Sequence, residues 1–144
     1  MTLTLSDPGL LKSQAYINGQ WTDADNGATF AVTNPADGEL IVEVAKVGAA
    51  ETARAIAAAQ EAMASWKALP AKSRAGILRK WFDLMMASQE DLAIIMTAEQ
   101  GKVLAESRGE VAYGAAFVEW FGEQAKRIDG DVIPGPSPDR RIVC

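Results

Sequence analysis

The sequence contains no histidine and a single cysteine, Cys144, which is its last residue. These absences exclude a Ser-His-Asp triad, a Cys-His pair and a His-Cys metal cluster within the 144 residues. Cys144 is the one candidate for a covalent nucleophile, but no general base accompanies it. We therefore interpret it as an incidental cysteine and predict no catalytic residue.

Basic residues and long apolar runs are also scarce. Lys and Arg number 14 against 19 Asp and Glu, which gives a net charge of -5. Binding to phosphate backbones needs a surplus of positive charge, so we expect no nucleic-acid partner. No run approaches the roughly 18 apolar residues of a membrane helix, and the start, MTLTLSDPGL, lacks the basic region of a signal peptide. We expect no membrane partner, a frayed leader over residues 1–14 and a cytoplasmic location.

The composition is that of about one globular domain, with 49% hydrophobic and 23% charged residues. Candidate strands lie around residues 16–21, 29–33 and 40–44, and Asn26-Gly27 and Asp37-Gly38 separate them. Because Asn-Gly and Asp-Gly favour tight turns with positive φ, we predict a small antiparallel meander. Strands this short need other elements to cover one face.

Helical periodicity follows Gly48. The first helix has apolar residues at Ala53, Ile56, Ala59, Met63 and Trp66, and it ends at Leu69-Pro70. The second helix carries one apolar face, made of Ile77, Leu78, Trp81, Leu84 and Met85.

A third helix is predicted to open at Ser88 and to place Leu92, Ile95 and Met96 inside. The Ser88 hydroxyl is expected to accept a hydrogen bond from the Asp91 amide. Gly101 is well placed to end this helix.

The fourth helix, predicted over about residues 103–129, has two apolar stripes on nearly opposite sides. One stripe contains Val111, Gly114, Val118, Phe121, Ala125 and Ile128. The other contains Gly109, Tyr113, Ala116, Phe117 and Trp120. Since a surface helix of a small domain usually has one such stripe, we expect more protein or a ligand channel against this helix.

The tail, residues 131–144, is a proline-punctuated linker followed by the start of a strand from Arg140. A chain cut off there is one interpretation, and a frayed natural terminus is the other.

Some segments resemble phosphate-binding or calcium-binding motifs, but their residues do not have the spacing that these motifs require. There is no G-x-G-x-x-G, and Gly101-Lys102 is followed by Val103 where a P-loop needs Ser or Thr. Residues 23–27 resemble a calcium loop, but the glycine is one place early, so a turn is favoured. We predict no cofactor-binding residue.

The acidic clusters have structural interpretations. Glu90 and Asp91 sit in the first turn of a helix, where negative charge offsets the helix dipole. Glu106 is expected to pair with Lys102 at i, i+4 spacing.

Five segments together carry a resemblance to a known family: AYINGQW, VTNPADGELI, WKALPAKSR with ILRKW, MTAEQGKVLAESRGE and FVEWFGEQAKRIDGDVIPG. They resemble, in order, the opening of the aldehyde dehydrogenase superfamily, and within it the bacterial NADP-dependent succinate-semialdehyde dehydrogenases. The resemblance runs from about Gln14 to the last residue. It implies an α/β fold in which short antiparallel strands precede about four helices and the chain ends at the start of a strand.

The resemblance implies an oxidoreductase that converts an aldehyde, most simply succinate semialdehyde in GABA degradation, to its acid. In this family a cysteine thiolate attacks the aldehyde, hydride passes to NADP or NAD, and a glutamate activates water for hydrolysis of the thioester. The motifs for these groups lie beyond residue 144, and Cys144 in RRIVC does not match the nucleophile motif. The cofactor is accordingly expected to be held mainly by residues outside this sequence.

Site residues carry over from the resemblance in two places. Gly109, Tyr113 and Phe117 match inward-facing positions of the helix that lines the substrate tunnel, and Trp120 is next along the same stripe. Val32 and Glu99 lie near positions whose backbone carbonyls hold a monovalent cation in some members.

The resemblance also divides the chain. Residues 1–14 are the leader, residues 15–130 the first part of a nucleotide-binding domain, and residues 131–144 the start of an oligomerisation strand segment. The expected partners are the aldehyde substrate, the remainder of the enzyme and further subunits, as a homodimer or homotetramer.

Two alternatives stay open. The chain could be a non-catalytic helical binding or interaction module, or it could belong to another aldehyde dehydrogenase, such as one acting on glutarate semialdehyde.

Overall fold

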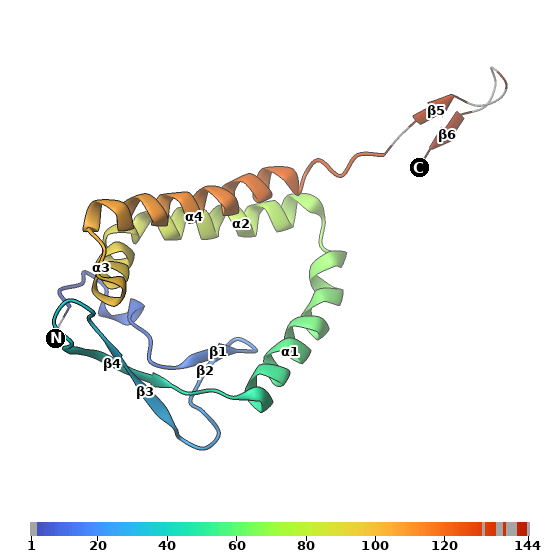
Figure 1. Ribbon diagram of the computed structural model, residues 1–144. Helices are drawn as coiled ribbons and strands as arrows, with labels where there is room; N and C mark the ends of the chain where they lie inside the picture. Colours follow the sequence, from blue (N-terminus) through green and yellow to red (C-terminus); the bar gives the residue numbers. More distant parts are fainter. Residues whose placement is uncertain (1–2, 131, 135–136, 138–140, 144) are drawn as a thin grey trace.

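The computed structural model describes residues 3–130, 132–134, 137 and 141–143. The predictions for Asp131, Arg140 and Cys144 therefore lie outside the described residues. The elements follow the order η1 (Pro8–Leu10), β1 (Ala15–Ile17), β2 (Gln20–Thr22), β3 (Thr29–Thr33), β4 (Leu40–Ala45), α1 (Ala49–Ala68), α2 (Ala71–Ala87), α3 (Gln89–Gln100), α4 (Leu104–Gln124), β5 (Val132–Pro134) and β6 (Arg141–Val143) (Figure 1). The expected class, α/β with short antiparallel strands before four helices, is confirmed.

The strands form separate hairpins, so the predicted single meander is wrong. β1 pairs with β2 and β3 pairs with β4, each antiparallel, in two different two-stranded sheets. What was predicted as a first strand over residues 16–21 turns back at Asn18-Gly19, with φ of 50° and 79°. Two successive positive φ values are typical of a type I′ hairpin turn. Asp37-Gly38 does form the turn between β3 and β4, whereas Asn26-Gly27 lies in the connection between the hairpins.

The helices form an open arc (Figure 1). α2 and α4 lie side by side, and α3 packs against the start of α4. α2 and α4 approach closely at Gly122, where an added methyl group would lie 3.4 Å from Leu78 Cβ. α4 ends at Gln124, five residues before the predicted end.

The predicted Ser88 cap is absent. Ser88 ends α2 and begins α3 at once, with φ -103° and ψ 13°, and its side chain makes no capping hydrogen bond. Asp91 has a different function: its carboxylate accepts the backbone N–H groups of Ser6 (2.9 Å) and Asp7 (2.8 Å). These bonds hold part of the expected frayed leader against α3. Gly101 ends α3 in the left-handed region at φ 74°, as predicted.

The predicted apolar stripes of α1 and α2 are largely unburied. Ile56 and Met63 of α1 are 64% and 55% exposed. Trp81 of α2 is 55% exposed, while Leu78, on the side toward α4, is half-buried. The periodicity therefore predicted the helices correctly, but not that this chain would cover their apolar faces.

The core contains no large apolar side chain among the described residues. The buried hydrophobic residues are small: Ala24, Ala75, Ala93, Ala98, Val111 and Ala115. The chain exposes 10203 Å² of surface, whereas a compact monomer of 15.3 kDa exposes about 7,100 Å². The described elements therefore form a single layer, and few of their large apolar side chains are buried by a second one.

The C-terminal segment forms an antiparallel hairpin of β5 and β6 that extends away from the helices (Figure 1). A strand after the linker was expected and is present at Arg141–Val143. Its partner β5 falls within the stretch that was predicted to be a linker, because the prolines there obscured a three-residue strand.

Candidate functional site

The clearest candidate site is an aromatic groove on α4. It has a volume of about 430 Å³ and is lined by Tyr113, Ala116, Phe117, Trp120 and Phe121. We call these five residues the α4 groove. The Tyr113 and Phe117 rings meet edge to face, with centroids 4.9 Å apart and an interplanar angle of 85°.

The spacing of small residues on α4 decides which side of the helix carries this groove. Ser107, Val111, Ala115 and Gly122 are buried on the side that packs against α2 and α3. Ser107 is within hydrogen-bonding distance of Thr97 on α3 (Oγ to Oγ1, 2.8 Å). The aromatic stripe is left on another side, where Tyr113, Phe117 and Trp120 are 67%, 48% and 61% exposed.

The structure brings together three of the four predicted tunnel residues. Tyr113, Phe117 and Trp120 line the groove, whereas Gly109 is exposed on the same helix and is not part of the lining. Phe121 lines the groove but had been grouped with the opposite stripe, because it follows Trp120 by about 100° of helical rotation. Phe121 could have been predicted if the whole aromatic patch had been counted instead of only the residues at strict helical spacing.

The lining of the groove is aromatic and apolar except for the Tyr113 hydroxyl. None of its lining residues is a cysteine, lysine or carboxylate that would attack, protonate or deprotonate a substrate. Among the described residues no group of three or more His, Cys, Asp or Glu residues is placed to hold a metal ion. The α4 groove offers mainly apolar contact, together with the Tyr113 hydroxyl.

Ion pairs surround the start of α4. Arg108 binds Glu90 of α3 through two hydrogen bonds of 2.7 Å, and this guanidinium lowers the pKa of Glu90 below its ordinary value. Lys102 pairs with Glu110, not with Glu106 as predicted. The i, i+4 rule does not apply to Lys102, because the residue after it, Val103, is extended and the helix begins at Leu104.

The predicted cation positions lie on two elements that touch. β3 contains Val32, and α3, which contains Glu99, packs against β3. The C-cap Gly101 lies so near Pro35 that a methyl group on it would be 2.8 Å from Pro35 Cγ. The cation itself stays a prediction.

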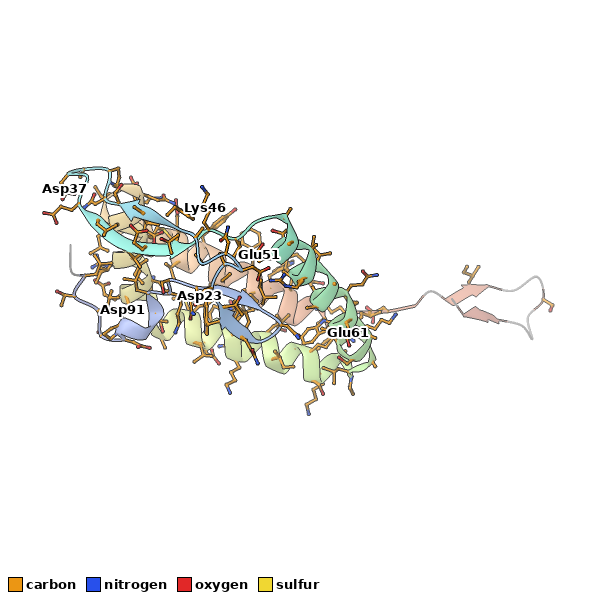
Figure 2. All side chains as sticks on the ribbon, turned by 90° about the horizontal axis from the view of Figure 1, so that it is seen from below. Asp23, Asp37, Lys46, Glu51, Glu61 and Asp91 are labelled. Atoms are coloured by element: carbon orange, nitrogen blue, oxygen red, sulfur yellow. The ribbon has the colours of Figure 1, made fainter. Side chains whose placement is uncertain are left out.

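A carboxylate lies at the start of α1, the end of a helix at which negative charge is favoured. Glu51 accepts the N–H of Gly48 at Oε2 and the N–H of Asp25 at Oε1, both at 3.0 Å, and these bonds lower its pKa. Figure 2 shows Glu51 at this junction between α1 and the preceding loops.

No helix among the described residues has the length and apolarity to cross a membrane.

Comparison with known proteins gives a consistent result. The aldehyde dehydrogenase family profile matches residues 21–144. The chain is 60% identical over 141 residues to a glutarate-semialdehyde dehydrogenase of Pseudomonas aeruginosa and 55% identical over 141 residues to an NADP(+) succinate-semialdehyde dehydrogenase of Escherichia coli. Each match covers 98% of this chain and 29% of the relative.

A solved structure matches equally well. The crystal structure of an aldehyde dehydrogenase from Brucella melitensis is 55% identical and superposes with a TM-score of 0.91, over 98% of this chain and 29% of that one. The chain thus spans less than a third of the length of the relatives that it matches.

Proposed function

The chain belongs to the aldehyde dehydrogenase family, and we propose that it forms the N-terminal portion of an NAD(P)-dependent enzyme that oxidises a short semialdehyde with a terminal carboxylate. Succinate semialdehyde is the substrate expected from the sequence, and glutarate semialdehyde is the second candidate because of the 60% identical relative. Both have a short methylene chain, which suits the aromatic lining of the α4 groove.

The observation that carries the proposal is the α4 groove. Tyr113, Phe117 and Trp120 form an uncharged wall for the substrate chain. Oxidation of an aldehyde by NAD(P) and water yields the acid, NAD(P)H and a proton, and it needs a nucleophile, a base and a cofactor site. The lining of the α4 groove contains no cysteine and no carboxylate, and following the family resemblance we assign the nucleophile, the base and the cofactor site to the remainder of the enzyme. The cytoplasmic location and the oligomerisation role of residues 131–144 stay predictions.

The test uses a joined enzyme. Residues 1–144 would replace the matching region of the Pseudomonas aeruginosa glutarate-semialdehyde dehydrogenase, followed by the remainder of that relative. We expect aldehyde-dependent NAD(P)H formation by the joined enzyme and none by residues 1–144 alone. A folded joined enzyme without activity, or turnover by the isolated chain, contradicts the proposal.

A second joined enzyme, made with the remainder of the Escherichia coli succinate-semialdehyde dehydrogenase, separates the two substrates. Because the groove is uncharged, we expect each joined enzyme to prefer the substrate of the relative that supplies its remainder. Both should discriminate against an uncharged aldehyde of equal length. A preference that stays with residues 1–144 would place the carboxylate selectivity in this chain instead.

A further inference from the structure

The three asparagines of the chain differ in the residue that follows them. A glycine follows Asn18 and Asn26, and a proline follows Asn34. The side-chain amide of an asparagine can be attacked by the backbone nitrogen of the next residue, and glycine hinders this approach least because it has no Cβ. Proline has no backbone N–H to lose, so Asn34 cannot react in this way. The two Asn-Gly pairs are alike in sequence, and the fold has to distinguish them.

Asn26 is held by hydrogen bonds at both of the groups that would react. Its Oδ1 accepts the N–H of Ala28 at 2.9 Å, and the N–H of Gly27 donates to the carbonyl of Ala24 at 2.8 Å. Both bonds have to break before the Gly27 nitrogen can attack the Asn26 amide carbon. Because each broken bond costs free energy, the fold protects Asn26.

Asn18 lies in a turn in which neither group is held. Asn18 and Gly19 connect β1 to β2 with φ of 50° and 79°, and both residues are exposed. Within the described part of the chain, neither the Asn18 side chain nor the Gly19 N–H makes a hydrogen bond. The amide carbon and the nitrogen that would attack it are therefore both accessible.

The hairpin around this turn is small. β1 and β2 have three residues each and form a two-stranded sheet of their own. Such a hairpin is marginally stable in water, and exposed elements of this kind open locally at little cost in free energy. Opening lets the Asn18 side chain and the main chain rotate until Cγ meets the Gly19 nitrogen.

We propose that Asn18 is the site at which this chain deamidates. The Gly19 nitrogen loses its proton to solvent base and forms a bond to Asn18 Cγ, while the Cγ–Nδ2 bond breaks and Nδ2 takes up a proton and leaves as ammonia. Water then opens the cyclic imide at either carbonyl. Opening at Cγ gives aspartate, and opening at the backbone carbonyl gives isoaspartate, in which the main chain runs through Cγ.

Isoaspartate at this position alters the hairpin. It places an extra methylene group in the main chain between the paired residues Ile17 and Gln20, and it adds a negative charge. Asn18 and Gly19 line a cavity of about 290 Å³ together with alanines of α1. The modification therefore changes the turn where the hairpin faces α1, and amide hydrogen exchange in β1 and β2 should become faster.

The test follows the folded joined enzyme, verified by circular dichroism, during prolonged incubation at pH 8. Trypsin releases residues 13–46 as one peptide that contains all three asparagines, so tandem mass spectrometry locates the modification and electron-transfer fragmentation distinguishes isoaspartate from aspartate. We expect Asn18 to deamidate about tenfold or more faster than Asn26, and Asn34 to stay unchanged. Asn18→Gln should remove the fast modification, and the matched control Asn26→Gln should keep it.

Incubation of the unaltered protein in guanidinium chloride separates the effect of the fold from that of the sequence. In the unfolded chain the hydrogen bonds of Asn26 are lost, so the two Asn-Gly pairs should react at similar rates. Equal rates in the folded enzyme, faster reaction at Asn26, an unreactive Asn18, or a difference that persists after unfolding would each overturn the proposal. The readout is covalent and does not depend on NAD(P)H formation, so failure of the proposed function would leave this inference intact.

Discussion

Two buried carboxylates, Glu51 and Asp91, hold the loops of this chain to its helices. Each is 6% exposed, and each uses both oxygens to accept backbone N–H groups. Asp91 reaches from α3 to Ser6 and Asp7, about 85 residues away in sequence, and Figure 2 shows it beside the N-terminal segment. Single side chains thus connect segments that are far apart in the sequence.

Asp91 predicts a pH dependence. The bonds from Ser6 and Asp7 lower its pKa below the ordinary value of 3.8. A lowered pKa in the folded state means that the stabilisation is present above that ordinary value and is lost as the pH falls through the folded-state pKa. In the joined enzyme, Asp91→Asn should lower the melting temperature at pH 7, and the difference from the unaltered protein should shrink below about pH 4.

The measurement is thermal unfolding as a function of pH, together with hydrogen exchange at the Ser6 and Asp7 amides. Glu61→Gln, on an exposed part of α1, is the control. A loss of stability that is the same at pH 3 and pH 7 would show that the charge of Asp91 has no part in it.

Gly101 makes a second prediction at the scale of one residue. Its φ of 74° and its closeness to Pro35 both oppose a side chain. Gly101→Ala should lower the free energy of unfolding of the joined enzyme by about 1–3 kcal/mol. Gly76→Ala, in α2 with nothing within 4 Å of the added methyl group, should raise it by up to about 1 kcal/mol. Denaturant titration of both variants checks the opposite signs, and equal effects would contradict the strain at Gly101.

At the scale of elements, α4 has two functions on two sides. Small residues on one side allow α2 and α3 to approach, and aromatic residues on another side form the groove. The packing side differs from the first predicted stripe, of which Val111 is buried while Phe121 and Ile128 are 59% and 75% exposed.

The side of α4 that packs against α2 predicts opposite effects on stability for a small and a large side chain at Gly122. Gly122→Ala places a methyl group 3.4 Å from Leu78 Cβ, an ordinary contact, and the gain in helix propensity should leave the free energy of unfolding unchanged or raise it by up to about 1 kcal/mol. Gly122→Leu should lower it by about 1–3 kcal/mol because α2 must move away. Urea titration of the two joined enzymes makes the comparison. A Leu variant as stable as the Ala variant would mean that the helices are not in close contact there.

The groove side predicts an effect on catalysis. In the joined enzyme, Phe117→Ala removes part of the wall and should lower kcat/KM for glutarate semialdehyde about tenfold or more. Tyr113→Phe keeps the ring and should have little effect. Steady-state kinetics, with circular dichroism to verify folding, test the pair. An unchanged kcat/KM for Phe117→Ala would remove the groove from the substrate path.

At the scale of the whole molecule, the chain has the elements of a domain without the core of one. Its buried hydrophobic residues in the described part are five alanines and one valine, while Trp81, Trp120, Phe121 and Ile128 are all more than half exposed. Burial of apolar surface is the main source of free energy that offsets the loss of chain entropy on folding, so such a layer is poorly stabilised by itself.

The isolated chain should therefore associate or aggregate. We expect residues 1–144 alone to bind a hydrophobic dye and to elute as oligomers or in complex with other proteins, and addition of the remainder in trans should reverse both. Size-exclusion chromatography and dye fluorescence provide the readouts. A monodisperse monomer that unfolds cooperatively would contradict this expectation.

The sequence by itself determined what local interactions decide. The four helices follow from apolar spacing, the end of α1 from Leu69-Pro70, the end of α3 from Gly101, and the aromatic grouping of Tyr113, Phe117 and Trp120 from helical rotation. The absence of histidine excluded histidine-dependent catalytic sets from these 144 residues. Family membership was also legible in short motifs of the chain.

Only the tertiary structure decided which faces are covered and which side chains join distant segments. The strands form separate hairpins because the chain turns back already at Asn18-Gly19. The Asp91 carboxylate accepts the amides of Ser6 and Asp7, a contact that the sequence did not predict, and the predicted Ser88 cap does not form. Periodicity distinguishes apolar faces from polar ones, but burial depends on which elements are present to pack against them. On α2 and α4 the described elements leave apolar faces uncovered, and the α4 groove is one of them.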